Sequence, residues 1–600
     1  MIEFFTSNFV PVMFAGLLVF LLLGFPVSFS LAATGLFFGF IGMELELFPS
    51  NLFQALPLRV FGIMQNDTLL AIPFFTLMGI ILERSRMAED LLETVGQVFG
   101  PLRGGVGIAV VLVGALLAAT TGVVAASVIS MGLIAMPIML RYGYNRTIAT
   151  GTITASGTLA QALPPSLVLI VLADQLGRSV GDMYAGALVP GLALVGLYLA
   201  FIIVVALFKP SWVPALPPEA RIYNEPNGSS GHRSLLALLV LCAAAGYGWS
   251  QVHESIMNPW LEREMPAPGD EVFILSMTIS AFLALALALV NKLFGIGLLS
   301  RLTERVTFVL IPPLVLIFLV LGTIFLGVAT PTEGGAMGAI GALIMAGARR
   351  TLSFGLLKQA LENTTKLAIF VLFILIGSTV FSFTFNAADG HVWVEHLFAK
   401  LPGGQLGFLL FVNALVFVLG MFIDFFEIAF IVVPLLAPVA DKLGIDLIWF
   451  GIILAMNLQT SFLTPPFGFA LFYLRSVAAR NDYDDVVTGE RIPAVTTAQI
   501  CKGSIAFIIL QIIMVAVIVF NPGIVTGNLD KAVKLDNAEV MDMLNNMQDL
   551  QSDDPYGAEE KPAGDTPATE EGLEPPAEGA AADEEIDPAK ALEESLKKAE

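Results

Sequence analysis

The stretch Ala155–Ser166, with the sequence ASGTLAQALPPS, places two adjacent prolines inside a long apolar segment. A second pair lies in Gln459–Gly468, QTSFLTPPFG, and each proline of the first pair is 301 residues from its counterpart. Adjacent prolines remove two backbone donors and break a helix. In lipid, the released carbonyls need partners from protein or from an aqueous cavity. The two stretches therefore predict two broken helices at matching places in the chain.

The same spacing recurs upstream of the proline pairs and indicates a duplicated chain. Pro101 matches Pro402, and Pro137 matches Pro438, both at an offset of 301 residues. Self-similarity at a fixed offset is the sequence signature of a structural repeat. Matched helix breaks in two repeats point to a transporter site near the middle of the membrane.

The composition places most of the chain in lipid. Hydrophobic residues make up 56% of the sequence, charged residues 14%, and the mean hydropathy is +0.82. Soluble proteins carry roughly 45–50% apolar and about 25% charged residues. We therefore expect an all-α polytopic membrane protein with two inverted repeats. The segments 105–140 and 405–440 are too long for one crossing of about 20 residues. Each is expected to form two helices or a re-entrant hairpin.

Four regions follow from these patterns. Residues 1–208 form the expected first repeat and residues 306–524 the second. Between them, residues 209–305 form an insert with a polar, proline-rich linker and two extra membrane helices. Most of the net charge of −21 falls in the last region, residues 525–600. That region cannot bury enough apolar surface to offset its chain entropy, so we expect a disordered acidic tail.

Neutral polar side chains precede both proline pairs and are candidates for a binding site. Hydroxyl and amide oxygens suit a hard cation such as Na⁺. The alternative interpretation is that the hydroxyls join helices, as small polar residues do in membranes. The candidate substrate- or ion-binding residues are Thr154, Ser156, Gly157, Thr158, Pro164 and Pro165 in the first half, and Asn457, Gln459, Thr460, Thr464, Pro465 and Pro466 in the second.

The long segments supply further candidates at their expected tips. Thr120, Thr121 and Gly122 form a small, flexible stretch in the first segment. In the second, Asp424 and Glu427 lie three residues apart on one helical face. Carboxylates in an apolar run are a functional hypothesis by default. They could equally cap the second helix of the hairpin, and both interpretations stay open.

Several other classes of function lack a sequence signal. A glycine-rich ATP-binding loop ending in lysine is missing, which argues against ATP-driven transport. The four histidines show no suggestive spacing from a serine or cysteine, so an enzyme is not expected. Two amphipathic stretches, 86–100 and 389–401, predict helices along the membrane surface that connect fixed and moving parts.

The chain resembles the large membrane subunit of the tripartite ATP-independent periplasmic (TRAP) transporters over roughly residues 9–521. The stretches that carry the resemblance are Gly114–Gly122, Ala155–Ser166, Ala329–Ala336 (ATPTEGGA) and Gln459–Gly468. Within the family it most resembles the branch labelled for mannitol or chloroaromatic compounds. The resemblance implies a multi-pass protein of the cell inner membrane that imports small organic acids with Na⁺ by an elevator mechanism.

The resemblance also implies partners and ion ligands. A separate small four-helix membrane subunit and a periplasmic substrate-binding protein would complete the transporter. Na⁺ is the implied coupling ion, with no organic cofactor. The implied ligands for Na⁺ are Thr120, Gly122, Ser156, Gly157, Gln459 and Thr460. The Thr-Thr-Gly tip departs from the Ser-Gly-Ser type of many relatives, and the family suggests a cytoplasmic tail. A stand-alone Na⁺- or H⁺-coupled carrier of organic anions, working without a binding protein, remains the alternative.

Overall fold

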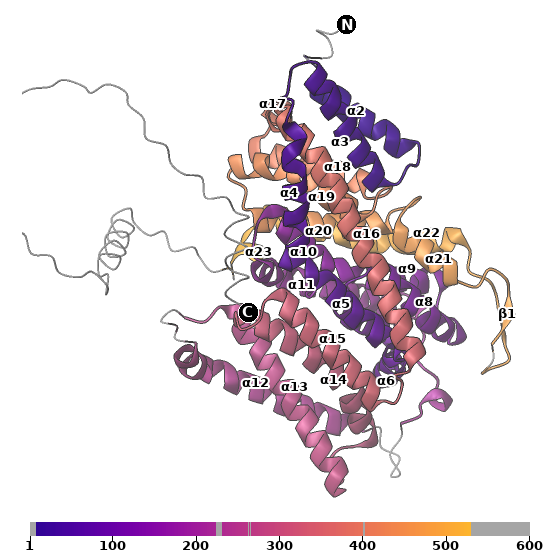
Figure 1. Cartoon of the computed structure of the whole chain (residues 1–600). Helices are drawn as coiled ribbons and strands as arrows, with labels where there is room; N and C mark the ends of the chain where they lie inside the picture. Colours follow the sequence, from indigo (N-terminus) through magenta and orange to yellow (C-terminus); the bar gives the residue numbers. More distant parts are fainter. Residues whose placement is uncertain are drawn as a thin grey trace, which may run out of the picture. The chain divides into compact units, whose positions relative to one another are not determined.

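The computed structural model describes residues 6, 8–223, 231–261, 263, 266–399, 402–485, 487–527 and 529. The described chain is almost entirely helical (Figure 1). Its β structure is one short antiparallel pair, β1 (Tyr483–Asp484) and β2 (Arg491–Ile492). The acidic tail expected over residues 525–600 lies almost wholly outside the described residues.

The helices follow the order that the repeat predicts. The first half contains α2 (Phe9–Leu22), α3 (Val27–Glu44), η1 (Leu52–Ala55), α4 (Leu56–Met64), α5 (Asp67–Arg84), α6 (Met87–Phe99), α7 (Gly105–Thr121), α8 (Val124–Arg141), α9 (Arg146–Thr158), η2 (Leu159–Gln161), α10 (Leu167–Leu176) and α11 (Val180–Phe208). Between the halves lie η3 (Pro210–Trp212), η4 (Pro218–Ala220), α12 (His232–Trp260) and α13 (Gly269–Phe294). The second half contains α14 (Arg301–Phe325), α15 (Pro331–Ala348), α16 (Phe354–Ala387), α17 (Gly390–Ala399), α18 (Gly404–Leu419), α19 (Phe425–Lys442), α20 (Leu447–Leu463), α21 (Phe469–Val477), α22 (Thr497–Phe520) and α23 (Gly523–Thr526).

Eight of the described helices are long and apolar enough to cross a membrane. A ninth is obtained if Leu52–Met64 and Asp67–Arg84, which meet at a bend of 44°, form one broken span. The protein is therefore a multi-pass membrane protein, as its composition predicts.

Both long segments fold as helical hairpins, and both proline pairs interrupt helices. α7 and α8 turn back at Gly122, whose φ of +60° is a conformation that glycine adopts without strain. α18 and α19 form the corresponding hairpin in the second half. The proline pairs separate α9 from α10 and α20 from α21, and both Pro–Pro peptide bonds are cis. The predicted fold class is confirmed in these elements.

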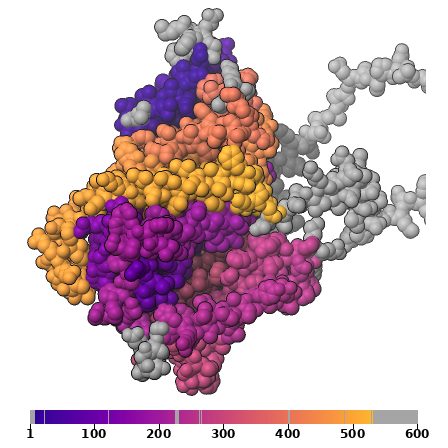
Figure 2. All heavy atoms as spheres, turned by 180° about the vertical axis from the view of Figure 1, so that it is seen from behind, coloured from indigo at the N-terminus to yellow at the C-terminus, as the bar shows by residue number. Residues whose placement is uncertain are grey.

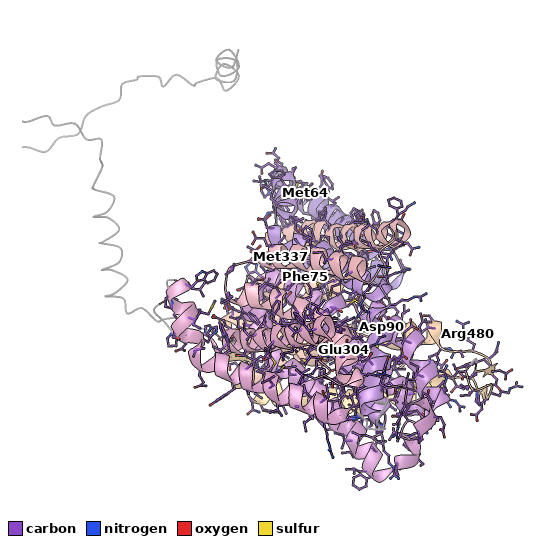
Figure 3. All side chains as sticks on the ribbon, turned by 90° about the horizontal axis from the view of Figure 1, so that it is seen from below. Met64, Phe75, Asp90, Glu304, Met337 and Arg480 are labelled. Atoms are coloured by element: carbon purple, nitrogen blue, oxygen red, sulfur yellow. The ribbon has the colours of Figure 1, made fainter. Side chains whose placement is uncertain are left out.

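The two halves exchange equivalent partners. α3 packs against α16, and α15 packs against α5 (Figure 1). Because α3 corresponds to α15 and α5 to α16, the two pairs are related by the repeat. A Cβ added at Gly35 would lie 2.7 Å from the carbonyl oxygen of Val380, so glycine permits this crossing. Figure 3 shows Phe75 of α5 beside Met337 of α15 in the equivalent crossing. We call α3, α5, α15 and α16 the framework.

Hydrogen bonds between helix ends define one face of the molecule, at the open end of the first hairpin. The backbone N–H of Gly104 donates to the carbonyl of Val213 at 2.9 Å. Arg141 at the end of α8 pairs with Asp485 at 2.9 Å. These contacts bring the segment after α11 and the loop before α22 to the open end of α7 and α8. We call this the hairpin-1 face.

The opposite helix ends meet at the open end of the second hairpin. Asn66, before α5, donates to Asp174 near the end of α10 at 2.7 Å. Trp449, at the start of α20, donates through Nε1 to the carbonyl of Ile518 near the end of α22 at 3.0 Å. Arg178, after α10, lies 3.9 Å from Asp441 near the end of α19. We call this the hairpin-2 face.

The stretches 86–100 and 389–401 form the helices α6 and α17. Each is preceded by a non-glycine residue in the left-handed region, Arg86 with φ of 59° and Asp389 with φ of 54°. Such conformations cost on the order of 1–3 kcal/mol and persist where the surrounding structure imposes them. Asp90 of α6 pairs with Arg349 at the end of α15 at 2.7 Å, which fastens α6 to the framework.

Candidate functional site

The first broken helix is buried from Ile148 to Ala173, including its polar residues. Thr154, Ser156 and Thr158 are each 0% exposed. Their hydroxyls donate to backbone carbonyls of α9 at 2.9, 2.6 and 2.9 Å, which satisfies each hydroxyl hydrogen inside the helix. A hydroxyl oxygen also carries acceptor lone pairs. These residues can therefore offer oxygen atoms to a cation without leaving a donor unpaired.

The tip of the first hairpin lies against this break. A Cβ added at Gly122 would lie 3.1 Å from Cγ of Leu167, the first residue of α10. A Cβ added at Gly157 would lie 3.0 Å from the backbone nitrogen of Val128 in α8. Small residues on both elements thus permit backbone contact. Thr120 is buried at the tip, and its hydroxyl donates to a carbonyl one turn earlier at 2.8 Å.

Not every predicted residue of the first half is fully placed. The backbone of Thr121 ends α7, but its side chain lies outside the described part of the chain. Pro164 and Pro165 are buried between η2 and α10. The tip and the break therefore form one contiguous region.

The second hairpin turns at two half-buried carboxylates that cap a helix. Asp424 is the N-cap of α19, and its carboxylate accepts from the backbone N–H of Phe425 at 2.7 Å. Glu427 accepts from the backbone N–H of Asp424 at 3.1 Å, which completes a capping box. The capping interpretation therefore has a geometric basis, and a further role in binding stays a proposal.

The polar residues of the second broken helix are engaged mainly with neighbouring backbone. Asn457 donates to the carbonyl of Asn413 in α18 at 2.7 Å. Thr460 and Thr464 donate to carbonyls one turn earlier at 3.0 and 2.8 Å. This second break is less enclosed than the first, since Pro466 is exposed and Thr464 and Pro465 are half-buried.

The two repeats meet at a buried group of polar side chains, which we call the central polar cluster: Thr158, Tyr198, Gln459 and Gln511. Gln459 is the repeat equivalent of Thr158, and its amide nitrogen lies 3.4 Å from Thr158 Oγ1. The same nitrogen lies 3.4 Å from Tyr198 Oη, to which Gln511 donates at 2.6 Å. All four side chains are at most 1% exposed. The cluster joins α9, α20, α11 and α22.

Sequence reasoning missed Tyr198 and Gln511, because each is a single polar residue within a long apolar run, residues 185–208 of α11 and 505–520 of α22. That isolation was itself a signal, since a polar group deep in a membrane helix needs a partner. Their association with the predicted Thr158 and Gln459 becomes visible only when α11 and α22 are placed beside the broken helices.

Three buried amides near the two breaks keep unused hydrogen-bonding groups. Within the described part of the chain, both polar atoms of Gln161 and the side-chain oxygens of Gln459 and Gln511 have no hydrogen-bond partner. Gln161 is 0% exposed and lies three residues before the first proline pair. Leaving such a group unsatisfied costs about 1–3 kcal/mol. These amides are therefore the groups in the region best able to bind an ion, a substrate or water.

Two cavities with mixed polar and apolar linings lie beside the framework. One, of about 310 Å³, lies between Val123–Ile129 at the start of α8 and the framework residues Thr76 and Glu83. The other, of about 370 Å³, lies between Arg59 of α4, Ser382 of α16 and Asp174 of α10. The first opens on the hairpin-1 half and the second on the hairpin-2 half.

The donor set suits a hard ion. In the described residues, no three His, Cys, Asp or Glu side chains come together as a metal site. The predicted ligands instead offer hydroxyl, amide and carbonyl oxygens, which match the preferences of a hard cation rather than a transition metal.

Comparison with known proteins gives the geometry its context. The family described as "Tripartite ATP-independent periplasmic transporter, DctM component" matches residues 14–524. The chain belongs to this family. As a DctM component it is a transporter rather than an enzyme, and a TRAP large permease implies a small membrane subunit and a periplasmic binding protein as partners. The large permease is accordingly an inner-membrane protein.

Several relatives match most of this region. The C4-dicarboxylate TRAP transporter large permease protein DctM of Pseudomonas aeruginosa is 27% identical over 72% of this chain and 83% of its own. The sialic acid TRAP transporter large permease protein SiaM of Vibrio cholerae is 24% identical over 77% and 88%. Among solved structures, the YdaH transporter of Alcanivorax borkumensis matches with a TM-score of 0.47 and 12% identity, over 79% of this chain and 88% of that one.

Proposed function

We propose that the large permease imports a small organic acid together with Na⁺, after delivery by a periplasmic binding protein. The observation that carries this proposal is the meeting of both broken helices at buried amides with unused oxygens. The named relatives transport C4-dicarboxylates and sialic acid, both of which are organic acids. A carboxylate substrate therefore fits the family.

Substrate binding would rest on backbone groups and neutral side chains. None of the predicted site residues is cationic. The N-termini of α10 and α21 begin directly after the breaks, and helix N-termini attract anions through their free N–H groups. Hydroxyl and carbonyl oxygens at Ser156, Gly157 and Thr460 would hold Na⁺. A bound Na⁺ would also offset the charge of the carboxylate.

The distribution of cations orients the protein. Near the hairpin-1 face lie Arg84, Arg86, Arg103, Arg141, Arg146, Lys209, Arg221, Arg233, Lys292, Arg301, Arg305, Arg349, Arg350, Lys358, Arg475, Arg480, Arg491 and Lys502. Near the hairpin-2 face, the described residues include Arg59, Arg178, Arg263 and Lys442. Loops rich in Lys and Arg stay in the cytoplasm, so we infer that the hairpin-1 face is cytoplasmic.

The resemblance suggests a cytoplasmic tail, for which the described chain would have to end on the cytoplasmic face. α22 ends on the hairpin-2 face, where Val525 after it packs near Gly186 of α11. The described chain therefore ends on the face that we infer to be periplasmic. The linear sequence did not reveal this because it does not show which loops share a face.

The arrangement of parts supports an elevator mechanism. The hairpins and broken helices form a body that surrounds the site, and α3, α5, α15 and α16 form the framework beside it. The helices α6 and α17 connect the two through the sharp turns at Arg86 and Asp389. A cavity on each side would give the site access to one face at a time.

Uptake into proteoliposomes tests this function. The large permease and its small subunit would be reconstituted, and labelled dicarboxylates and sialic acid supplied with their binding protein. We expect uptake that needs both an inward Na⁺ gradient and the binding protein. Uptake without the binding protein would instead establish the stand-alone carrier, and uptake indifferent to Na⁺ would remove the proposed coupling ion.

A further inference from the structure

An apolar cavity of about 520 Å³ separates the insert from the first hairpin. Every residue that lines it is apolar, and the lining comes from α6, α7, α11, α12, α13 and α14. Pro164 of the first break and Leu116 of the hairpin form part of its wall. Figure 2 shows a hollow between the purple segments of the first half and the pink segments of the insert. The cavity therefore lies beside the candidate site but is not part of it.

The packing around the cavity indicates that protein alone does not fill it. α12 and α13 pack on each other and on α14. Leu235, Leu302 and Val306 form a small hydrophobic cluster that is separate from the main core. An apolar gap of this kind excludes water because it offers few hydrogen-bond partners. An apolar occupant would restore the missing contacts.

We propose that this cavity holds an acyl chain of a membrane phospholipid. Its wall on α14 runs from Val306 to Leu321, a length of about 22 Å at 1.5 Å per residue. That length accommodates an acyl chain, since one leaflet of the hydrocarbon core is about 15 Å thick.

The cavity has a mouth through which a chain can enter from the bilayer. Leu192 of α11, Leu239 of α12 and Phe273 of α13 line the cavity and are 47%, 58% and 40% exposed. These side chains lie in membrane-spanning helices, so the mouth opens to lipid. The insert thus forms one wall of a lipid site between α14 and the first hairpin. The bound acyl chain would fill the space between the first hairpin and the insert, and because it is flexible it would keep contact with both.

Photolabelling tests the occupant. The full chain with its small subunit would be reconstituted with a phospholipid that carries a diazirine near the end of its acyl chain. After irradiation, adducts would be mapped by mass spectrometry. We expect adducts on the cavity-facing residues Leu116, Leu314 and Phe318. Adducts confined to outward-facing residues would overturn the proposal. Evidence that the small subunit contacts Leu116, Leu314 and Phe318 would also overturn it.

Cavity-filling variants provide the control. Ala115→Trp fills the cavity from α7, and Ala119→Leu fills it less severely in case the larger residue prevents folding. Leu319→Trp is the matched variant, since Leu319 is 36% exposed on α14 and does not line the cavity. In folded filling variants, labelling of Phe318 is expected to be largely lost, and in Leu319→Trp to stay unchanged. Equal labelling in all three would contradict the assignment. This test is independent of the proposed Na⁺ coupling, which the uptake assay alone addresses.

Discussion

At the scale of single residues, the first broken helix offers buried neutral oxygens to the candidate site. The hydroxyls of Thr154, Ser156 and Thr158 place their hydrogens within α9. The amides of Gln161 and Gln459 keep oxygens without a partner in the described chain. A native protein retains such costly groups where they serve binding, so these amides are the residues to test first.

Gln161→Met is expected to separate function from stability. The two side chains are similar in size, and the change removes two unsatisfied polar atoms from a buried position. The free energy of unfolding should therefore stay the same or rise by about 1 kcal/mol. Na⁺-dependent uptake should fall by about tenfold or more if Gln161 contacts the ion or substrate. Gln54→Met, at an exposed position in η1, is the matched control. Unchanged uptake in Gln161→Met would remove this residue from the site.

The ion pair of Asp485 with Arg141 predicts a pH dependence outside the membrane. Burial acts to raise the pKa of Asp485, but hydrogen bonds from Arg141 and Thr488 outweigh it and lower the pKa to about 2. The stabilisation is therefore complete above the ordinary pKa near 3.8 and is lost as the pH falls toward 2. Asp485→Asn should lower stability by about 1 kcal/mol, equally at every pH from 5 to 8. Thermal unfolding across this range checks the expectation, and a difference that varies with pH there would refute it.

At the scale of elements, the hairpins and helix breaks position the candidate site residues, and N-caps determine where the helices start. The second hairpin illustrates this, since Asp424 and Glu427 form the capping box of α19. The insert shows a second means of fixing a helix pair. Glu271 of α13 accepts hydrogen bonds from Arg263 at 2.8 and 2.9 Å and lies 2.8 Å from His253 of α12.

Variants of Asp424 distinguish capping from binding. Serine retains an N-cap acceptor, whereas alanine does not. Asp424→Ala is therefore expected to lower stability by about 1 kcal/mol, and Asp424→Ser by only a few tenths. If the carboxylate also contacts the ion, both variants lose Na⁺-dependent uptake. Full uptake in Asp424→Ser would show that Asp424 acts only as a cap.

The buried network of the insert predicts a large local effect. Glu271 and His253 are each 0% exposed, so removing the carboxylate would leave buried partners without their acceptor. Glu271→Ala is expected to destabilise the α12–α13 pair by about 3 kcal/mol. Protease cleavage in this segment should become faster. Glu254→Ala, on the exposed side of α12, is the matched control. Equal protease resistance in the two variants would contradict a stabilising role.

At the scale of the whole molecule, the repeat could be predicted from the sequence because prolines and glycines recur at a constant offset. The proline pairs, the hairpins and the α6 and α17 helices lie where the 301-residue offset places them. Contacts between distant segments left no such mark. In the insert, α12 continues to Trp260, and its His253 is buried against Glu271 of α13, a pairing that the linear sequence does not indicate. The joining of Tyr198 and Gln511 to the site likewise required the packed helices.

The central claim of the proposed mechanism is that the body, formed by the hairpins and broken helices, moves relative to the framework. Spin labels at Arg103, on the base of the first hairpin, and at Leu352, after α15, would report the distance between the two parts. Labels at Phe25 and Leu352 would report the framework alone. Both pairs would be measured by pulsed electron paramagnetic resonance in lipid nanodiscs, in a chain without Cys242 and Cys501.

The deciding measurement is the change in the distance from Arg103 to Leu352 between Na⁺-free conditions and saturating Na⁺ with substrate and binding protein. An elevator that moves the body by about 15 Å, half the thickness of the hydrocarbon core, predicts two separate populations of the distance from Arg103 to Leu352, while the distance from Phe25 to Leu352 stays constant. A single unchanged distance from Arg103 to Leu352, in protein that transports, would contradict the elevator.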